Sequence, residues 1–392
     1  VTLGDVATIS WGDTSTTKAA YAKSGFPAYS ATGQDGLLPY ADHTEDGVVI
    51  SAIGAQCGKT WYAAGSWSCI KNTLWMRGKP GLDTRFLFYA TSRQDLWPRR
   101  GAAQPFIGLG DAKAMRLRIP DDVTQVAIGT VLGSMDKLIE NNRRRVEVLE
   151  EMARAIYREW FVKFRYPGHE DVPLVDSPLG RIPEGWRTPQ LADLVSTQYG
   201  YTESATSEPL GPRYLRGMDI NKKSFIDWSS VPFCPIDQTA RNKFAIQVGD
   251  VFVIRMADPG KVGICETEVD AVFASYLVRM RPSSAALSPY FLFFTLSDAQ
   301  YQAWIVGASG GATRKSVSSR VMTEPPIVLP PPELQQAFEG IIVPMRKALT
   351  VRVRENAKLT ALRDLLLPKL VTGQIDVSTL DLDALISSTS SQ

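Results

Sequence analysis

Three short strings in this sequence resemble the motifs of known enzymes. Residues 54–60 resemble a phosphate-binding loop, but three residues separate the two glycines where that loop has four, so the backbone amides cannot aim at a phosphate in the same way. Residues 307–311 fit the G-x-S-x-G pattern of hydrolases, which need a histidine after the serine, whereas both histidines, His43 and His169, precede it. Residues 324–327 resemble the Asn/Asp-Pro-Pro-aromatic loop of amino-methyltransferases but lack both the amide and the aromatic side chain. We interpret these strings as turns and a strand end, and we expect no active site in this chain.

Cysteine and histidine are too few and too scattered to predict a metal site. The four cysteines show neither C-x-x-C spacing nor neighbouring histidines, which argues against zinc, and four in 392 residues form no disulfide framework. We expect Cys57, Cys69, Cys234 and Cys265 to be buried as small apolar side chains. With only two histidines, every mechanism that needs an imidazole base is also disfavoured.

Polar and basic loops are better candidates, and the chemistry that they favour is DNA binding. Glycine lets the backbone approach a phosphate closely, and arginine can read guanine through two hydrogen bonds. The candidates in the first half of the chain are Thr32, Gln34, Lys59, Lys71, Arg99, Arg100 and Gln104. Those in the second half are Arg213, Arg216, Asn221, Lys222, Arg255, Lys261, Gly310, Gly311, Thr313, Arg314, Lys315 and Ser316. Any one of them can be an ordinary solvated residue, but similar loops recur in both halves, which favours a binding role.

Two long helices are predicted to position these loops, over residues 123–165 and 332–372. Apolar residues recur at every third and fourth position, as in the seam of a coiled coil, and each seam contains one asparagine. The seam residues are Leu132, Met135, Ile139, Asn142, Val146 and Leu149 in the first helix, and Ile342, Met345, Leu349, Asn356, Leu359 and Leu366 in the second. Plain core or linker packing is the simpler interpretation. The sharper one is an antiparallel pair with Asn142 opposite Asn356, because a polar seam residue fixes register at a cost in stability.

The chain is also an internal repeat of one module followed by one helix. Matched pairs separated by 202 residues (249−47, 260−58 and 279−77) are Gly47 and Gly249, Gly58 and Gly260, and Arg77 and Arg279. Further matches are Gly101 with Gly307 and Gly129 with Gly340, at separations of 206 and 211. Strands are predicted at residues 48–50, 73–76 and 116–119, and an aromatic helix at residues 85–92 that recurs at residues 290–294. A repeated framework with divergent loops predicts two related sites of different specificity.

Composition and length agree with a soluble protein of several domains. The sequence is 44% hydrophobic and 21% charged, and no apolar run reaches the 18 residues of a membrane span, so we expect a cytoplasmic protein. The net charge of +2 requires any nucleic-acid site to be a local basic face. The fold class that we predict is α/β, with α+β modules in a pseudo-twofold repeat. The predicted segments are a module at 1–122, a helix at 123–165, an irregular linker at 166–185, a module at 186–331, a helix at 332–372 and a tail at 373–392.

Three stretches carry a resemblance to a known family. Residues 179–186 read Leu-Gly-Arg-Ile-Pro-Glu-Gly-Trp, residues 330–336 Pro-Pro-Pro-Glu-Leu-Gln-Gln, and residues 362–370 Leu-Arg-Asp-Leu-Leu-Leu-Pro-Lys-Leu. With these stretches the chain resembles, over nearly its whole length, the specificity subunit of a type I restriction–modification system. The first module lacks the Ile-Pro-Glu-Gly-Trp opening, as expected for a trimmed or shorter start. At residues 119–125 the first helix also departs from the Pro-Pro-x-x-Glu-Gln pattern of the family.

The resemblance implies a chain without catalysis, built from two target-recognition domains, 1–122 and 186–331. Each domain would read one half of a bipartite site in double-stranded DNA, and the helices would set the spacing and dock two methyltransferase subunits. The outer helix face, with Arg143, Arg144, Glu147, Glu150, Glu151 and Arg154, is a candidate docking surface or simply a solvated charged face. S-adenosylmethionine would be bound by the methyltransferase partners. ATP and magnesium would be bound by a restriction motor–nuclease, if present, which joins through the methyltransferase subunits.

Other functions stay open at this point. Within the same class, the chain can serve a methylation-only or related phage-defence system. Different classes are a stand-alone DNA-modifying enzyme, against which the missing cofactor and catalytic loops argue, and a coiled-coil scaffold that does not bind DNA. Base-reading residues vary by design in the family, so no individual DNA contact follows from the resemblance.

Overall fold

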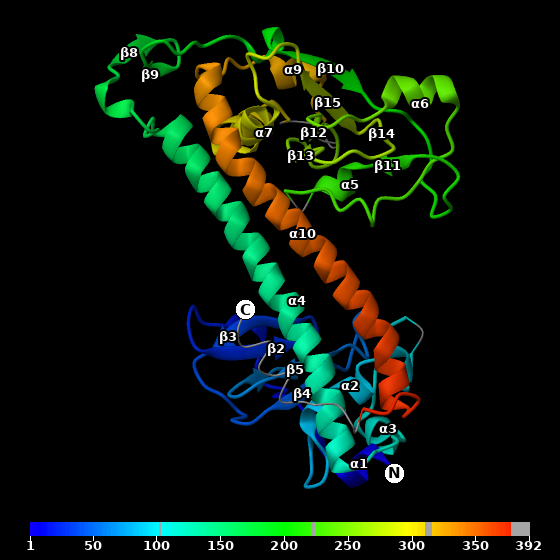
Figure 1. Cartoon of the computed structure of the whole chain (residues 1–392). Coiled ribbons are helices and arrows are strands. Elements are labelled where there is room, and N and C mark those ends of the chain that lie inside the picture. Colours follow the sequence, from blue (N-terminus) through cyan, green and yellow to red (C-terminus); the bar gives the residue numbers. More distant parts are fainter. Residues whose placement is uncertain (102, 222–223, 310–315, 378–392) are drawn as a thin grey trace. The chain divides into compact units, whose positions relative to one another are not determined.

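The computed structural model describes residues 1–101, 103–221, 224–309 and 316–377, which form two compact units. Unit 1 combines Val1–Asn142 with Glu355–Gln392, and unit 2 is Arg143–Arg354. Both units include part of each long helix, α4 (Asp122–Tyr157) and α10 (Pro332–Val371) (Figure 1). Unit 1 therefore combines the N-terminal part of the chain with the second half of α10 and the described residues after it. The predicted segment boundaries stay a prediction.

Unit 1 is built on a four-stranded antiparallel sheet in the order β1-β7-β4-β5. These strands are β1 (Ala7–Trp11), β4 (Gly47–Ser51), β5 (Thr60–Ala63) and β7 (Thr73–Gly78). A second sheet contains β2 (Phe26–Ser30), β3 (Gly33–Leu38) and β6 (Ser68–Cys69), with β2 parallel to β6. The short helices are α1 (Leu3–Val6), α2 (Thr84–Thr91) and α3 (Leu109–Ala114), with 3₁₀ turns at Lys18–Ala20 and Gln94–Leu96.

Unit 2 repeats this plan with the strand order β10-β15-β12-β13. Its main sheet contains β10 (Val195–Tyr199), β12 (Val251–Ile254), β13 (Val262–Ile264) and β15 (Leu277–Pro282). A parallel pair joins β11 (Arg213–Leu215) to β14 (Ala271–Phe273). The helices are α5 (Gly217–Ile220), α6 (Gln238–Phe244), α7 (Pro289–Ser297), α8 (Ala299–Ala308) and α9 (Ser319–Thr323), with 3₁₀ turns at His169–Asp171 and Leu191–Asp193.

Strand pairing confirms one match of the predicted repeat and corrects two others. The amides of Gly58 and Gly260 donate to the carbonyls of Ser51 and Ile254, both at 2.9 Å, so these two glycines are equivalent. Val48 lies opposite Met76, and Val251 lies opposite Met280, so Val48 corresponds to Val251. The predicted match of Gly47 with Gly249 is therefore wrong by one residue, and such a slip would exchange the two faces of the strand.

The match of Arg77 with Arg279 is also wrong. Arg77 lies opposite Thr8 on the first strand, and Arg281 lies opposite Ser196 at the equivalent position of β10. Both arginines pair with an acidic residue that precedes the next strand, at 2.6 Å to Glu45 for Arg77 and 2.6 Å to Asp250 for Arg281. The loops between these strands differ in length by one or two residues between the two units, and this difference shifted the predicted alignment.

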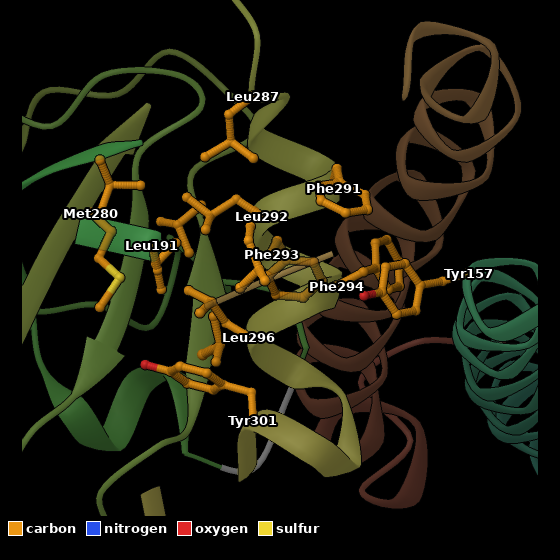
Figure 2. Close-up of a cluster of buried hydrophobic side chains, with 14 of the residues drawn as sticks. Tyr157, Leu191, Met280, Leu287, Phe291, Leu292, Phe293, Phe294, Leu296 and Tyr301 are labelled. Carbon is orange, nitrogen blue, oxygen red and sulfur yellow. The ribbon is translucent and has the colours of Figure 1, made fainter. Parts of the chain in front are cut away.

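The core of unit 2 surrounds α7, in which Phe291, Leu292, Phe293, Phe294 and Leu296 are all buried. In Figure 2, Leu292 lies toward Leu191 and the sheet, whereas Phe294 lies toward Tyr157 of α4. Phe161, in the π-helical turn Arg158–Val162 that ends α4, is 5.0 Å from both Phe291 and Phe338 between ring centroids. These aromatic contacts anchor the ends of both long helices in unit 2.

The core of unit 1 packs α2 between the sheet and the long helices. Its buried residues include Val48, Ile50, Leu74, Met76, Phe86, Leu87, Ala127, Ile128, Leu132, Leu370 and Val377. The chain that follows α10 thus stays packed as far as Val377. All four cysteines are buried, as predicted. Burial raises the pKa of the Cys69 and Cys265 thiols to about 12, which keeps them protonated.

Inside unit 1, α4 and α10 run antiparallel. Asn142 Nδ2 donates to Asn356 Oδ1 at 3.1 Å, and Asn356 Nδ2 donates to the Ile139 carbonyl at 3.1 Å. Arg363 lies 2.7 Å from Asp136, so residue numbers rise along one helix as they fall along its neighbour. The predicted seam residues are all buried or half-buried.

Near the start of each long helix, a buried glutamine forms hydrogen bonds to the unit in which that helix begins. Gln335 is 2% exposed; its Oε1 accepts from the Ser288 amide at 2.8 Å, and its Nε2 donates to the carbonyls of Ala286 and Pro330 at 2.9 and 3.0 Å. Gln125 makes the same set of bonds to Asp83, Gly81 and Pro120 in unit 1. The first helix therefore keeps this geometry although its sequence departs from the family pattern. The two glutamines are 210 residues apart (335−125), which also corrects the match of Gly129 with Gly340 by one residue.

We expect Gln335→Ala to lower the free energy of unfolding by about 2–4 kcal/mol, because it leaves a buried amide and two carbonyls without partners. Chemical denaturation of the purified chain measures this change. Gln336→Ala is the matched control, since its side chain is exposed, and it should change little. Equal effects of the two substitutions would contradict the role given to Gln335.

Two local predictions are wrong. The predicted linker contains a hairpin of β8 (Leu174–Ser177) and β9 (Gly180–Pro183), whose turn uses Pro178 and Gly180 at positive φ. The predicted strand at 116–119 is irregular and forms only a bridge between Thr2 and Arg116. Among the described residues, no helix is both long and apolar enough to cross a bilayer.

Candidate nucleic-acid interface

The turn from β4 to β5 in unit 1, and the equivalent turn from β12 to β13 in unit 2, are each hydrogen-bonded to a second loop. In unit 1 this turn is residues 52–59, and the Ile107 amide donates to its Ala52 carbonyl at 2.9 Å. In unit 2 it is residues 255–261, and the Val317 amide donates to its Arg255 carbonyl at 2.9 Å. Backbone pairing thus brings together segments that are 55 positions apart in unit 1 (107−52) and 62 positions apart in unit 2 (317−255).

In unit 1, a cation and an aromatic ring lie where this turn ends. Lys59 is exposed, and its Nζ lies 5.7 Å from the centroid of the Trp61 ring, which is half-buried. Gly33 has φ +110°, and a Cβ at that position would lie 3.0 Å from Trp61 Nε1, so the turn between β2 and β3 packs closely on the indole. The structure therefore brings Lys59 together with Thr32 and Gln34 on either side of Gly33.

The turn at Thr32 is held by Asp35. Lys18 Nζ lies 2.6 Å from Asp35 and 3.0 Å from the Thr32 hydroxyl, and the Tyr21 hydroxyl donates to Asp35 at 2.7 Å. Partial burial alone would raise the pKa of Asp35, but hydrogen bonds from Lys18, Ser30 and Thr32 outweigh it and hold this pKa far below its usual range. Thr32 is thus part of a fixed ionic network in the free chain, whereas the Gln34 side chain is exposed.

The second loop of unit 1 adds further cations. Arg99 and Arg100 are exposed, and Arg100 is paired with Asp111 and joined by two backbone hydrogen bonds to Phe106. Gln104 is exposed in the same loop. Lys71 is also exposed, but it lies beside the segment at Thr16 and not in this loop. Its amide is 3.5 Å from the Thr16 carbonyl.

In unit 2, three candidates lie around the equivalent turn. The Arg255 guanidinium lies 4.8 Å from the centroid of the Tyr199 ring, and hydrogen bonds from Ser319 lower the pKa of this tyrosine. Lys261 is exposed and equivalent to Lys59. Ser316 is exposed and forms a β-bridge with Met256. Each unit therefore presents a cation on an aromatic ring at the same turn.

Two predicted residues already have partners inside unit 2. The Arg213 guanidinium lies 4.1 Å from the Phe233 ring centroid and donates to the Val231 carbonyl at 2.5 Å. Arg216 donates to Asp219 at 3.1 and 2.9 Å. The remaining candidates in this half are Asn221, which lines two cavities, and six residues that lie outside the described part of the chain, namely Lys222, Gly310, Gly311, Thr313, Arg314 and Lys315.

A cavity beside the turn of unit 2 was not predicted. It has a volume of about 510 Å³, and its lining includes Arg216, Met218, Met256, Asp258 and Tyr276. Met218 and Tyr276 are 71% and 53% exposed, which is high for such large side chains. Neither they nor Trp61 and Tyr199 stand out in the sequence, because aromatic residues near strand ends usually belong to the core. The Gly-Lys dipeptide that recurs at both turns is the signal that could have located this face.

Comparison with known proteins agrees with this architecture. The family described as type I restriction modification DNA specificity domain matches residues 1–151. The MjaIX specificity subunit of Methanocaldococcus jannaschii is 23% identical over 77% of this chain and 71% of its own length. The HindI specificity subunit of Haemophilus influenzae is 22% identical over 70% of this chain and 72% of its own length. A crystal structure of a type I S subunit from M. genitalium covers 94% of this chain and 95% of its own, with a TM-score of 0.65 and 17% identity.

The chain carries the type I restriction modification DNA specificity domain over residues 1–151, and over most of its length it is similar to type I restriction–modification specificity subunits. It is the subunit that gives such a system its DNA specificity, and it forms part of a complex that binds DNA. Specificity subunits are not catalytic and bind no cofactor, because the cofactors belong to the partner subunits. The three enzyme-like strings therefore need no catalytic explanation.

Proposed function

We propose that each unit of this specificity subunit reads one half of a bipartite DNA site. The observation that carries the proposal is the repeated turn, with Lys59 over Trp61 in unit 1 and Arg255 over Tyr199 in unit 2. A cation beside a partly exposed aromatic ring suits contact with phosphates and base edges. The framework around the turn is repeated while the loops differ, which supports two half-sites of different sequence. The segments 1–122 and 186–331 would be the two target-recognition domains.

The long helices would set the distance between the two half-sites. α4 has 36 residues and α10 has 40, and each runs without interruption through residues of both units. The paired Asn142 and Asn356 support a fixed register, because any sliding of one helix along the other would bury an unpaired amide in the seam.

The exposed faces of the two helices would dock two methyltransferase subunits. In unit 2, Val148 and Met152 lie one turn apart on α4 and are 52% and 50% exposed. In unit 1, Leu362 and Leu365 on α10 are 44% and 57% exposed. Exposed apolar pairs of this kind favour a protein partner. Through the methyltransferases the complex would also recruit a restriction motor–nuclease.

The predicted charged docking face needs one correction. Glu150 and Arg154 line an open cavity of unit 2 of about 330 Å³, together with Arg346. Glu150 also accepts a hydrogen bond from the Ser224 hydroxyl, so it is committed to the unit itself. The apolar residues named above therefore replace it in the proposed docking surface.

We expect Lys59→Ala with Arg99→Ala to weaken DNA binding by the assembled complex about 10- to 100-fold, since two cations leave the proposed interface. The slope of log affinity against log salt should fall by about two, one for each lost phosphate contact. Fluorescence anisotropy with a DNA duplex across a salt series measures both quantities.

The control for this prediction is Lys113→Ala with Arg116→Ala, which removes the same charge from exposed positions around α3. It should leave affinity and slope nearly unchanged, and both variants should still assemble with the partner. Equal losses in the two double variants would contradict the interface and indicate a nonspecific effect of charge.

A further inference from the structure

A buried ion pair in unit 2 joins α10 to the loop that follows β13. Arg346 is 3% exposed, and its Nε and Nη2 donate to the two carboxylate oxygens of Glu266, both at 2.7 Å. The guanidinium also lies 5.2 Å from the centroid of the Phe293 ring. Burial of an arginine is unfavourable unless every donor finds a partner, so this geometry is closely defined.

The same arginine holds a third segment. Arg346 Nη1 donates to the Ser224 hydroxyl at 3.1 Å, and Nη2 donates to the Ser224 carbonyl at 2.7 Å. The Ser224 hydroxyl in turn donates to Glu150 of α4. One serine is therefore bonded to both long helices within unit 2.

Ser224 follows the segment that forms one wall of the cavity on the candidate interface. Arg216, Gly217, Met218 and Asn221 line that cavity of about 510 Å³, facing the turn at Met256–Asp258. Asn221 also lines the second cavity, of about 330 Å³, together with Ser224 and Arg346. α5 is only four residues long and cannot hold this wall by itself.

We propose that Arg346 is a positioning residue for specificity, which fixes the wall at residues 216–221 against the helices and so determines what unit 2 reads. This inference rests on the proposed function, because it assumes that unit 2 reads its own half-site. Arg346 does not touch DNA in this account. Without the hydrogen bonds of Arg346, the wall at residues 216–221 can adopt several positions. Unit 2 then accepts several bases at a position of its half-site where it accepted one before.

The equivalent helix position in unit 1 serves a different purpose and provides a control. Asp136 is 210 residues before Arg346, the separation that also relates Gln125 to Gln335. Asp136 accepts from the Tyr89 hydroxyl at 2.6 Å and from Arg363 at 2.7 Å, so it joins α2, α4 and α10. These contacts lie among helices and do not include the turn at residues 52–59.

The test uses variants that separate folding from positioning. Arg346→Met alone leaves Glu266 buried without a partner, so Arg346→Met with Glu266→Met is the main variant, since it removes both charges at similar volume. Arg346→Lys keeps the charge but cannot hold Glu266 and Ser224 together through a planar fork. Ser224→Ala removes the hydroxyl bonds and keeps the carbonyl bond. Asp136→Asn is the matched control in unit 1.

Methylation of a randomised DNA library by each variant, assembled with its methyltransferase partner, gives the discrimination at every base position. We expect the double variant to lose at least tenfold discrimination in the unit 2 half, Arg346→Lys to lose less, and Ser224→Ala the least. The unit 1 half should stay as in the original chain, and Asp136→Asn should change neither half. Unchanged discrimination in a folded double variant, or equal relaxation of both halves, overturns the inference. A continuous motif for the unsubstituted chain would instead refute the proposed function itself.

Discussion

A chimera in which residues 1–122 come from another specificity subunit should modify a new DNA sequence in one half of the site only. The second half should be unchanged, because unit 2 carries its own sheet, turn and loop. Each half-site base pair contributes about 1–3 kcal/mol to discrimination, so the original sequence should be modified at least 100-fold more slowly. Sequencing of modified DNA from cells that express the chimera and its partner gives the result.

The design of this chimera must respect the core of unit 1. Leu370 and Val377, from the other end of the chain, pack into that core, so the donor should carry similar residues at the positions of Phe86 and Leu87. A reciprocal chimera of residues 186–331 is the control and should change only the other half. If either exchange alters both halves, the two units do not read DNA separately.

Lengthening both long helices by one heptad should increase the separation of the two half-sites. Seven residues add about 10.5 Å of helix at 1.5 Å per residue, which corresponds to about three base pairs at 3.4 Å each. Insertion after Asn142 and before Glu355, at the boundary between the units, keeps the paired asparagines and the seam of unit 1 intact. Modification of a library with spacers of different length measures the preferred separation.

Replacing seven residues at these places with the same heptad, without adding length, is the control and should leave the preferred spacer unchanged. Insertion into one helix only should disturb the pairing and reduce activity at every spacer. If the double insertion keeps the original spacer, the helices do not set the distance between half-sites.

Periodicity in the sequence predicted the helices well. The apolar heptads of both helices repeat over many turns, so an error at one position does not shift the rest of the pattern. The same pattern predicted the contact of Asn142 with Asn356. The repeat was predicted in outline, yet Gly47 and Arg77 were matched to residues one and two positions away from their true equivalents in unit 2. Loop lengths differ between the units, and single residues cannot show where a loop gains or loses one position.

The candidate interface was predictable only in part. Lys59, Arg255 and Lys261 lie at the turns, and the Gly-Lys dipeptide that recurs there is visible in the sequence. Arg213 and Arg216, in contrast, have partners within unit 2. Charge alone does not distinguish an arginine that is available to bind a phosphate from one whose contacts stabilise the fold. The contribution of Ser224 could not be predicted, because its bonds come from residues 74 and 122 positions away in the chain.

The most direct test of the proposed function is a genome-wide map of modified bases in a host that contains this chain and the proposed methyltransferase partner. We expect one split motif, with two short specified halves separated by a spacer of constant length and no sequence preference. One continuous motif, a spacer of variable length, or modification without sequence preference would contradict it.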